Sequence, residues 1–270
     1  MRLGYQGEPG SYSEEAALAL FPGSETAGYR SFAAVFDALA EGAVDAAVLP
    51  VENTLGGIVQ EVNDLLWERP GMRVAGEHVH PIRHCLLGRP EETVRRAISH
   101  PQALAQTRRW LEARGIEAVP FYDTAGAARE VAEHPQPGLA AIASAAASRI
   151  YGLAVLAAEI QDDDSNRTRF VVVERGPAAR PAGSDPGSKC SLCFVAAHRP
   201  GSLVAALQCL SSRGVNLLRL ESRPAGDRPF EYRFFIDFEV RQPSVAEEAL
   251  GALETEANEV RLFGTYRPSD

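Results

Sequence analysis

The stretch RGPAARPAGSDPGS, residues 175–188, decides how the chain is divided, because the sequence pattern changes on its two sides. It is rich in proline, glycine, alanine and serine, and it has neither helical nor strand periodicity, which is typical of a linker. We therefore predict two domains, residues 1–175 and residues 189–270, joined by a linker at 176–188.

Before the linker, short apolar runs alternate with amphipathic helical stripes. Residues 2–6 and 46–51 are predicted as strands, the second a continuous apolar run of the kind found in buried parallel strands. Apolar side chains recur with helical spacing over residues 32–39, in a helix that starts after Ser31 and ends at Gly42. The alternation continues to about residue 160 and predicts a mostly parallel α/β sheet, in one body or in two lobes.

After the linker the order of elements is different. Two strands follow one another between two helices, which gives the order βαββαβ of the ferredoxin-like plan. The predicted elements are strand 190–197, helix 201–213, strands 215–223 and 230–240, helix 243–257 and strand 259–266.

Composition excludes several classes of protein. Of the 270 residues 45% are hydrophobic and 23% charged, as in ordinary globular proteins. The net charge of −9 argues against nucleic-acid binding, which needs a basic face. The first residues lack the apolar core of a signal peptide, and no run is long enough to span a membrane. We expect a cytoplasmic protein without nucleic-acid or membrane partners.

Three patterns that resemble metal or cofactor sites fail on spacing. Asp162 begins a D-x-D-x-N run, but the position that must be glycine in a calcium loop is Arg167. Cys190 and Cys193 would point to opposite faces of one strand, and the histidines at 78–84 have no acidic or cysteine ligand at a recognisable spacing.

The glycines after the first strand form G-x-x-G-x-x-G rather than the dinucleotide fingerprint G-x-G-x-x-G. We therefore expect neither a metal nor a cofactor. A tight turn that leads into a helix N-terminus can still receive an anion.

Two further polar segments join a buried strand to a helix, one at 53–57 and one before a helix predicted over 101–114. Ligands bind at such strand ends in open α/β sheets. In the second segment Ser99 and Gln102 also fit a capping box, which is the better interpretation of Ser99 alone. It leaves Gln106 unexplained, one turn beyond Gln102 on the same helix face.

The segment SNRTRF, residues 165–170, opens another strand. Alternation along a strand places Thr168 and Phe170 on one face and Arg169 on the other. These segments offer hydroxyls, amides and helix ends without a strong base or a nucleophile triad. They suit a small anionic ligand, and the residues alone leave open whether that ligand is transformed.

Several stretches together resemble one family. They are YQGEPGSYSEEAA at 5–17, LPVENTLGGIV at 49–59, SHPQALAQT at 99–107, NRTRF at 166–170, RPGSL at 199–203 and VNLLRLESRP at 215–224. In this order they resemble prephenate dehydratase in its stand-alone form with a C-terminal ACT domain, over nearly the whole chain.

The resemblance implies a catalytic domain of two α/β lobes, like a periplasmic binding protein, and an ACT regulatory domain at 189–270. The lobes would be residues 1–76 with 160–175, and residues 77–159. It implies cofactor-free conversion of prephenate to phenylpyruvate, water and carbon dioxide. The implied catalytic residues are Thr168, Asn53, Ser99 and Gln106, and the implied substrate-binding residues are Thr54, Gln102, Gly7 and Ser11.

The resemblance also implies inhibition by phenylalanine, bound where two ACT domains meet in a homodimer or homotetramer. The implied effector residues are Gly201, Ser202, Leu203, Val204, Asn216, Glu221, Ser222, Arg223 and Pro224. Two alternatives stay open from the sequence: an arogenate dehydratase, and a non-catalytic protein that binds a small anion or amino acid.

Overall fold

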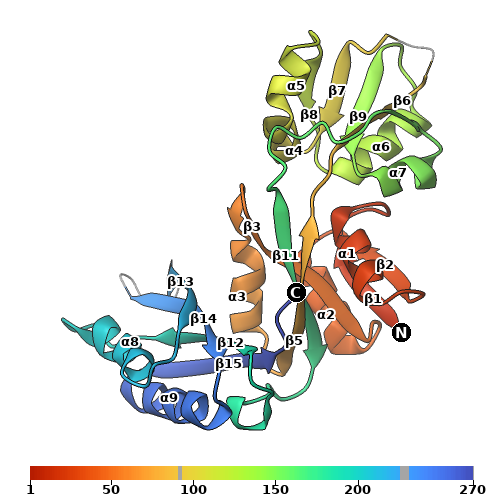
Figure 1. Cartoon of the computed structure of the whole chain (residues 1–270). Coiled ribbons are helices and arrows are strands. Elements are labelled where there is room, and N and C mark those ends of the chain that lie inside the picture. Colours follow the sequence, from red (N-terminus) through yellow and green to blue (C-terminus); the bar gives the residue numbers. More distant parts are fainter. Residues whose placement is uncertain (91–92, 226–230, 270) are drawn as a thin grey trace. The chain divides into compact units, whose positions relative to one another are not determined.

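The computed structural model describes residues 1–90, 93–225 and 231–269 (Figure 1). It forms two compact units: Met1–Val59 with Val79–Phe170, and Gln60–His78 with Val171–Asp270. The architecture is α/β with two sheets before the linker and α+β after it, which confirms the predicted fold class.

The first sheet contains the N-terminal strand in parallel pairing on both sides. Strand β1 pairs with β2 and with β3, and the full order is β2-β1-β3-β11-β5, with β4 beside β3. Strand β2 has no apolar alternation and was not predicted from the sequence. The strands are β1 (Arg2–Gln6), β2 (Glu25–Tyr29), β3 (Ala46–Asn53), β4 (Gly57–Ile58), β5 (Met72–Pro81) and β11 (Arg167–Arg175).

One helix beside this sheet begins and ends where the sequence predicts. Helix α2 (Phe32–Glu41) starts at Ser31, whose hydroxyl accepts the Ala34 N–H at 3.2 Å, and it ends at Gly42 with a left-handed φ of 77°. Helix α1 (Tyr12–Leu20) has Ser11 as its N-cap. Local capping chemistry is therefore sufficient to set these boundaries.

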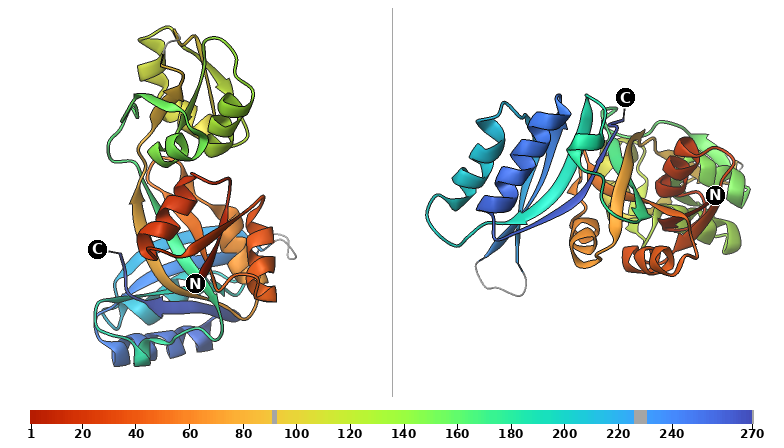
Figure 2. Two further views of the ribbon diagram at one scale, coloured as in Figure 1. Left: turned by 90° about the vertical axis from the view of Figure 1, so that its right-hand side faces the viewer. Right: turned by 90° about the horizontal axis from the view of Figure 1, so that it is seen from below.

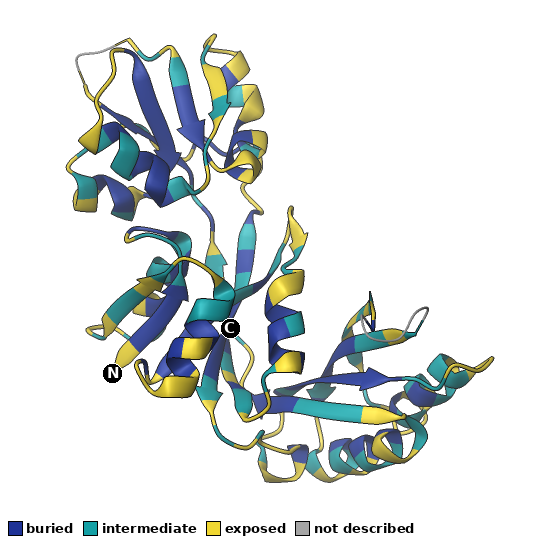
Figure 3. Cartoon of the chain, turned by 180° about the vertical axis from the view of Figure 1, so that it is seen from behind, coloured by how far each residue is buried: buried dark blue, intermediate teal, exposed yellow. Residues whose placement is uncertain are grey.

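The second sheet has the order β10-β6-β9-β7-β8. Strand β7 is parallel to β8 and β9, but β6 is antiparallel to β9 and β10, so the sheet is mixed rather than mostly parallel as predicted. Its middle strand β9 is entirely buried (Figure 3). The strands are β6 (Cys85–Gly88), β7 (Arg96–Ser99), β8 (Glu117–Pro120), β9 (Leu139–Ala143) and β10 (Ala154–Ala157).

Apolar side chains cover both faces of this sheet. One cluster joins Leu87 and Ala141 to Val131, and another joins Leu86 and Ile142 to apolar residues that include Leu104. Both clusters are needed because β9 is buried on both sides. The helices are α4 (Pro101–Gln106), α5 (Arg108–Glu112), α6 (Thr124–Glu133) and α7 (Ala145–Tyr151).

The helix predicted over 101–114 is in fact two short helices that meet at Thr107. The Thr107 hydroxyl donates back to the Ala103 carbonyl at 2.8 Å, and the residue leaves helical geometry with a φ of −123°. The predicted capping box is also wrong. His100 caps α4 with its imidazole, while the Ser99 hydroxyl points inward and donates to the Ile142 carbonyl at 2.6 Å.

The C-terminal elements follow the predicted order βαββαβ, in a sheet of order β13-β14-β12-β15. Helices α8 and α9 lie side by side on one face of it (Figure 2). Residue 230, where the third strand was predicted to start, lies outside the described residues. The elements are β12 (Ser188–Val195), α8 (Ser202–Ser211), β13 (Leu217–Pro224), β14 (Tyr232–Val240), α9 (Pro243–Glu256) and β15 (Glu259–Tyr266).

The other face of this sheet carries arginines that contact helix α3 (Gln60–Glu68), within the same unit. The guanidinium groups of Arg233 and Arg261 lie 5.0 Å and 4.8 Å from the Trp67 ring. Arg223 of β13 binds the Asp64 carboxylate of α3. In the described part of the chain, every helix is too short or too polar to span a membrane.

Candidate active site

A pocket of about 200 Å³ lies in the first unit, where residues from several predicted polar segments meet. Asn53 is the last residue of β3, Gln102 and Gln106 lie on α4, and Thr168 lies on β11. Apolar side chains that include Phe170 complete the lining. The structure thus places four of the predicted site residues in one cavity.

The Thr168 hydroxyl is held by the Asn53 side chain. The Asn53 amide nitrogen lies 2.9 Å from Thr168 Oγ1. The Asn53 carbonyl oxygen accepts the backbone N–H groups of Leu55 and Gly56 at 3.0 Å and 2.7 Å. Because the oxygen of the side chain is taken by two backbone donors, its nitrogen must face Thr168, and Asn53 acts as the donor to the hydroxyl.

Gln102 reaches the same asparagine, with its amide nitrogen 3.3 Å from Asn53 Oδ1. This approach requires glycine at position 56, since a Cβ there would overlap the Gln102 amide. The first glycine of the pair at 56–57 therefore has a steric reason.

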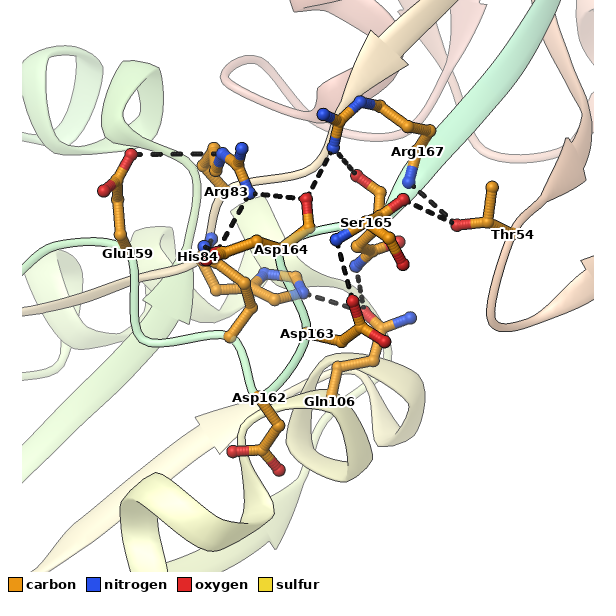
Figure 4. A network of polar contacts seen from close by, with 12 residues as sticks. Thr54, Arg83, His84, Gln106, Glu159, Asp162, Asp163, Asp164, Ser165 and Arg167 are labelled. Atoms are coloured by element: carbon orange, nitrogen blue, oxygen red, sulfur yellow. Dashed lines mark hydrogen bonds and ion pairs between the residues drawn. The ribbon is translucent and has the colours of Figure 1, made fainter.

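Gln106 belongs to a second polar group, centred on a buried histidine (Figure 4). Its Oε1 lies 2.9 Å from His84 Nε2 and 2.9 Å from Asn166 Nδ2. On the other side of the ring, His84 Nδ1 lies 2.8 Å from the Tyr12 hydroxyl. Burial lowers the pKa of His84 below its ordinary value of 6.5, although its contact with Gln106 opposes that shift.

Thr54 ties two polar segments together rather than facing the pocket. Its hydroxyl donates to the Ser165 carbonyl at 3.2 Å and accepts the Arg167 N–H at 3.0 Å (Figure 4). Arg83 donates to the Asp164 carbonyl at 3.0 Å. These contacts position the 53–57 turn against the segment that carries Thr168.

The aspartates at 162–164 form a turn with structural contacts. The Asp162 carboxylate accepts the backbone N–H groups of Arg109 and Trp110 at the start of α5, at 3.0 Å and 3.4 Å. Hydrogen bonds from Ser165 lower the pKa of Asp163. Among the residues that the structure describes, no group of three or more histidine, cysteine or acidic side chains could hold a metal ion.

Besides Thr54, three more predicted site residues lie outside this pocket. Ser99 is fully buried on the Ile142 carbonyl, and Ser11 is buried as the N-cap of α1. Gly7 has a φ of 120° and lines a separate pocket of about 720 Å³ with Glu8 and Arg129.

The predicted effector residues divide between the two faces of the C-terminal sheet. Ser202 and Leu203 line a pocket of about 380 Å³ at the start of α8, where Gly201 is the N-cap. Val204, Ser222 and Pro224 are exposed, and the Asn216 carbonyl accepts the Glu239 N–H at 2.9 Å. Alternation along β13 turns Glu221 and Arg223 to the opposite face, where Arg223 reaches α3.

Sequence reasoning missed three members of the site: Tyr12, His84 and Asn166. His84 was considered only as a metal ligand, Asn166 only as a calcium ligand and as part of the segment at 165–170, and no role was predicted for Tyr12. The available signal was their position, because each lies in or beside a polar strand end. Their convergence depends on contacts between segments 60 and 72 residues apart, which spacing cannot show.

Comparisons with known proteins agree with one another on the family. The family model for prephenate dehydratase matches residues 3–178. The chain is 40% identical over 284 residues to arogenate dehydratase/prephenate dehydratase 1 of Arabidopsis thaliana, covering 98% of this chain and 72% of the relative.

Two solved structures are similar over nearly the whole chain. A prephenate dehydratase from Arthrobacter aurescens, in complex with L-Phe, has a TM-score of 0.89 at 29% identity and covers 99% of this chain and 90% of its own. A structure described as GqqA, a novel type of quorum quenching acylases, has a TM-score of 0.91 at 35% identity, covering 100% and 98%. From its sequence, its fold and these matches, the chain belongs to the prephenate dehydratase family.

Proposed function

We propose that this protein is a prephenate dehydratase, which converts prephenate to phenylpyruvate with loss of carbon dioxide and water. The observation that carries the proposal is the Thr168 hydroxyl, which accepts a hydrogen bond from Asn53 at 2.9 Å in a pocket whose described lining includes no aspartate, glutamate, lysine or arginine. Family membership supports the same reaction.

The chemistry places small demands on the protein. The bond from the ring to its carboxylate carbon breaks, and the electron pair enters the ring. The ring then expels the hydroxyl at the opposite carbon, which takes up a proton and leaves as water. Formation of the aromatic ring supplies much of the driving force, so the protein has to orient the substrate and assist the departing oxygen.

Thr168 is suited to that assistance because of how Asn53 holds it. A hydroxyl that accepts from the Asn53 amide keeps its own proton available for donation. Thr168 is 8% exposed, and Phe170 beside it is 2% exposed. An apolar neighbour of this kind keeps water away from the departing group and strengthens a hydrogen bond to it.

Prephenate suits the pocket better than arogenate. Arogenate adds an ammonium group, which a binding site would pair with a carboxylate. No aspartate or glutamate is among the described residues that line the pocket. Purified protein incubated separately with the two substrates tests the proposal: we expect phenylpyruvate and carbon dioxide from prephenate at the higher kcat/KM. No carbon dioxide release from prephenate would refute it.

An acylase activity is the rival suggested by the similarity to GqqA. Covalent acyl transfer needs a nucleophile whose proton is taken by a neighbouring base. The Thr168 hydroxyl is instead hydrogen-bonded to the Asn53 amide nitrogen, which is a donor and not a base. Hydrolysis of an N-acyl substrate that is lost in Thr168→Ala would favour the rival; we expect no such hydrolysis.

We further infer that residues 1–175 form the catalytic domain and residues 189–270 an ACT regulatory domain that binds phenylalanine in a homodimer. The complex of the Arthrobacter aurescens enzyme with L-Phe supports this effector. Exposed apolar side chains beside the 380 Å³ pocket support association of two copies: Val204, Leu218, Leu220 and Tyr232 are 60%, 49%, 44% and 46% exposed. Light scattering with and without phenylalanine measures the association of two copies. An inhibition curve measures whether phenylalanine is the effector.

A further inference from the structure

We propose that Asn166, His84 and Tyr12 are positioning residues, joined in a one-way chain of hydrogen bonds that fixes His84 as its Nε2–H tautomer and turns the Gln106 amide nitrogen into the pocket. The direction of the chain rests on geometry alone. Its consequence for turnover rests on the proposed function.

The chain starts at Asn53, whose orientation is fixed from both ends. Its oxygen receives the N–H groups of Leu55 and Gly56, which can only donate. Its nitrogen lies 3.0 Å from the backbone carbonyl of Arg167, which can only accept. A flipped amide would place oxygen against oxygen at one end and nitrogen against N–H at the other, so only one orientation is satisfied.

The orientation of the Asn166 side-chain amide is fixed by its hydrogen bond from Asn53. The two hydrogens of Asn53 Nδ2 are shared among three acceptors, the Arg167 carbonyl, Thr168 Oγ1 and Asn166 Oδ1, the last at 2.9 Å. Because the nitrogen can only donate, the Asn166 atom that faces it is the oxygen, which leaves Asn166 Nδ2 to donate to Gln106 Oε1 at 2.9 Å. Asn166 is 0% exposed, so no water competes for these groups. Only one orientation of the Asn166 amide is therefore satisfied, and it makes Gln106 Oε1 an acceptor.

Gln106 in turn decides the protonation of His84. Because Gln106 Oε1 accepts from Asn166 and lies 2.9 Å from His84 Nε2, that ring nitrogen must carry a hydrogen. Burial favours the neutral imidazole and lowers the pKa of His84. Its Nδ1 is then bare and needs a donor, which the Tyr12 hydroxyl supplies at 2.8 Å.

The Arg83 carbonyl, 2.9 Å from the same Tyr12 hydroxyl, is the alternative acceptor. If Tyr12 donated there, a bare Nδ1 would face an oxygen lone pair at 2.8 Å. The Nε2–H tautomer excludes that arrangement, while the Nδ1–H tautomer would require it. The tautomer of His84 and the donor direction of Tyr12 are thus one coupled choice.

The outcome of the chain is the free end of Gln106. Its oxygen is held by two donors, and its amide nitrogen points away from His84 (Figure 4). Gln106 lines the pocket, and its amide nitrogen has no acceptor among the protein groups that the structure describes. Neither lysine nor arginine is among the described lining residues, so oriented amide N–H groups are the available donors for an anionic substrate.

The direct test is the tautomer of His84 in the wild-type protein, read from its two ring ¹⁵N shifts by NMR with His84→Gln for assignment. We expect a protonated Nε2 and a bare Nδ1. A protonated Nδ1 with a bare Nε2 would overturn the chain, whatever the activity. If the tautomer is as expected but prephenate is not turned over, the chain stands and the proposed function fails.

Kinetics of substitutions test the consequence. His84→Leu removes the donor to Gln106 and is expected to raise KM for prephenate about tenfold, with a smaller change in kcat. His84→Gln can place an N–H near the position of Nε2 and should recover most of that loss. His134→Leu, at the exposed end of α6, is the matched control. Equal KM values in His84→Leu and wild type would refute the positioning role.

Asn166→Asp reverses the chain without changing its size. At pH 8 a carboxylate at 166 can accept from Asn53 but cannot donate, so Gln106 has to turn its nitrogen toward 166 and toward His84. We expect the ring proton of His84 to move to Nδ1, with Tyr12 then donating to the Arg83 carbonyl. An unchanged Nε2–H tautomer in a folded Asn166→Asp protein would contradict the proposal.

Discussion

The amide nitrogen of Asn53 lies 2.9 Å from the hydroxyl oxygen of Thr168, although 115 residues separate the two in sequence. The contact gives each residue a defined role. Asn53 is the donor because backbone N–H groups occupy its oxygen, and Thr168 keeps its proton for a ligand. We therefore propose that the reactivity of the pocket depends on an orientation set by the turn at 53–57.

Thr168→Ala should lose most of kcat on prephenate, because the departing oxygen then has no donor. Positioned proton donors contribute roughly 10²- to 10⁴-fold, and we expect a loss in that range. Thr168→Ser keeps the hydroxyl and should keep much of the activity. Phenylpyruvate formation measures both, and equal activity of the alanine and serine variants would remove Thr168 from this role.

Asn53→Asp should reduce kcat about a hundredfold while the fold is retained. The carboxylate can still accept the Leu55 and Gly56 N–H groups, but it cannot donate to Thr168. The Thr168 proton would then turn toward position 53 and away from the substrate. Kinetics and a melting curve on the same sample separate loss of orientation from unfolding; full activity in a folded variant would contradict our account.

Sequence patterns predicted what depends on neighbours in the chain. Ser31 and Gly42 set the ends of α2 through local caps. The break at Thr107 was not predicted, because it accompanies one side-chain contact. The Thr107 hydroxyl donates to the Ala103 carbonyl where the helix stops. The predicted role of Ser99 as a cap failed for a similar reason, since its hydroxyl found a carbonyl on β9.

The residues of the site also differ in whether they depend on neighbours in the chain or on distant partners. Asn53 and Thr168 lie near strand ends and Gln102 and Gln106 lie on the helix that follows a strand, in polar segments that can be recognised one at a time, and the structure brings the four into one pocket. Asn166 gains its part only through partners 113 and 60 residues away. Long-range partners decide which polar side chain is oriented and which is solvated, and no spacing rule encodes them.

Gly56→Ala should raise KM for prephenate by roughly tenfold, with kcat less affected. The added methyl group would overlap the Gln102 amide, so Gln102 must leave Asn53 and its place in the pocket. Gly183→Ala is the control, because nothing lies within 4 Å of a Cβ at that position. If both variants behave like wild type, close packing at Gly56 has no bearing on substrate binding.

Asp64→Asn should weaken inhibition by phenylalanine while kcat without effector stays near wild type. Arg223, in the predicted effector segment, binds the Asp64 carboxylate and donates to Gln60 Oε1 at 2.5 Å. This ion pair joins β13 to helix α3, which follows the turn that carries Asn53 along the chain. Coupling energies of this kind correspond to a shift of about fivefold or more in the inhibitory concentration.

Asp185→Asn serves as the control for that experiment. Asp185 pairs with Arg267 on the surface, and the pair is 67% and 83% exposed in its side chains. Its loss should leave the inhibition curve where it is. An identical curve for Asp64→Asn would show that α3 plays no part in the response to phenylalanine.

The pH dependence of stability should carry a contribution from His84. Burial lowers its pKa in the folded protein below the ordinary value of 6.5, so the unfolded chain binds more protons in the interval between the two values. Stability therefore rises with pH through that interval and falls as the pH drops below about 6.5.

Urea titrations between pH 8 and pH 5 should show a smaller loss of stability for His84→Gln than for wild type. Carboxylates titrate in both proteins and cancel in the difference, whose slope for one group is at most about 1.4 kcal/mol per pH unit. Parallel curves would mean that His84 is protonated equally in both states, which would contradict its burial as a neutral ring.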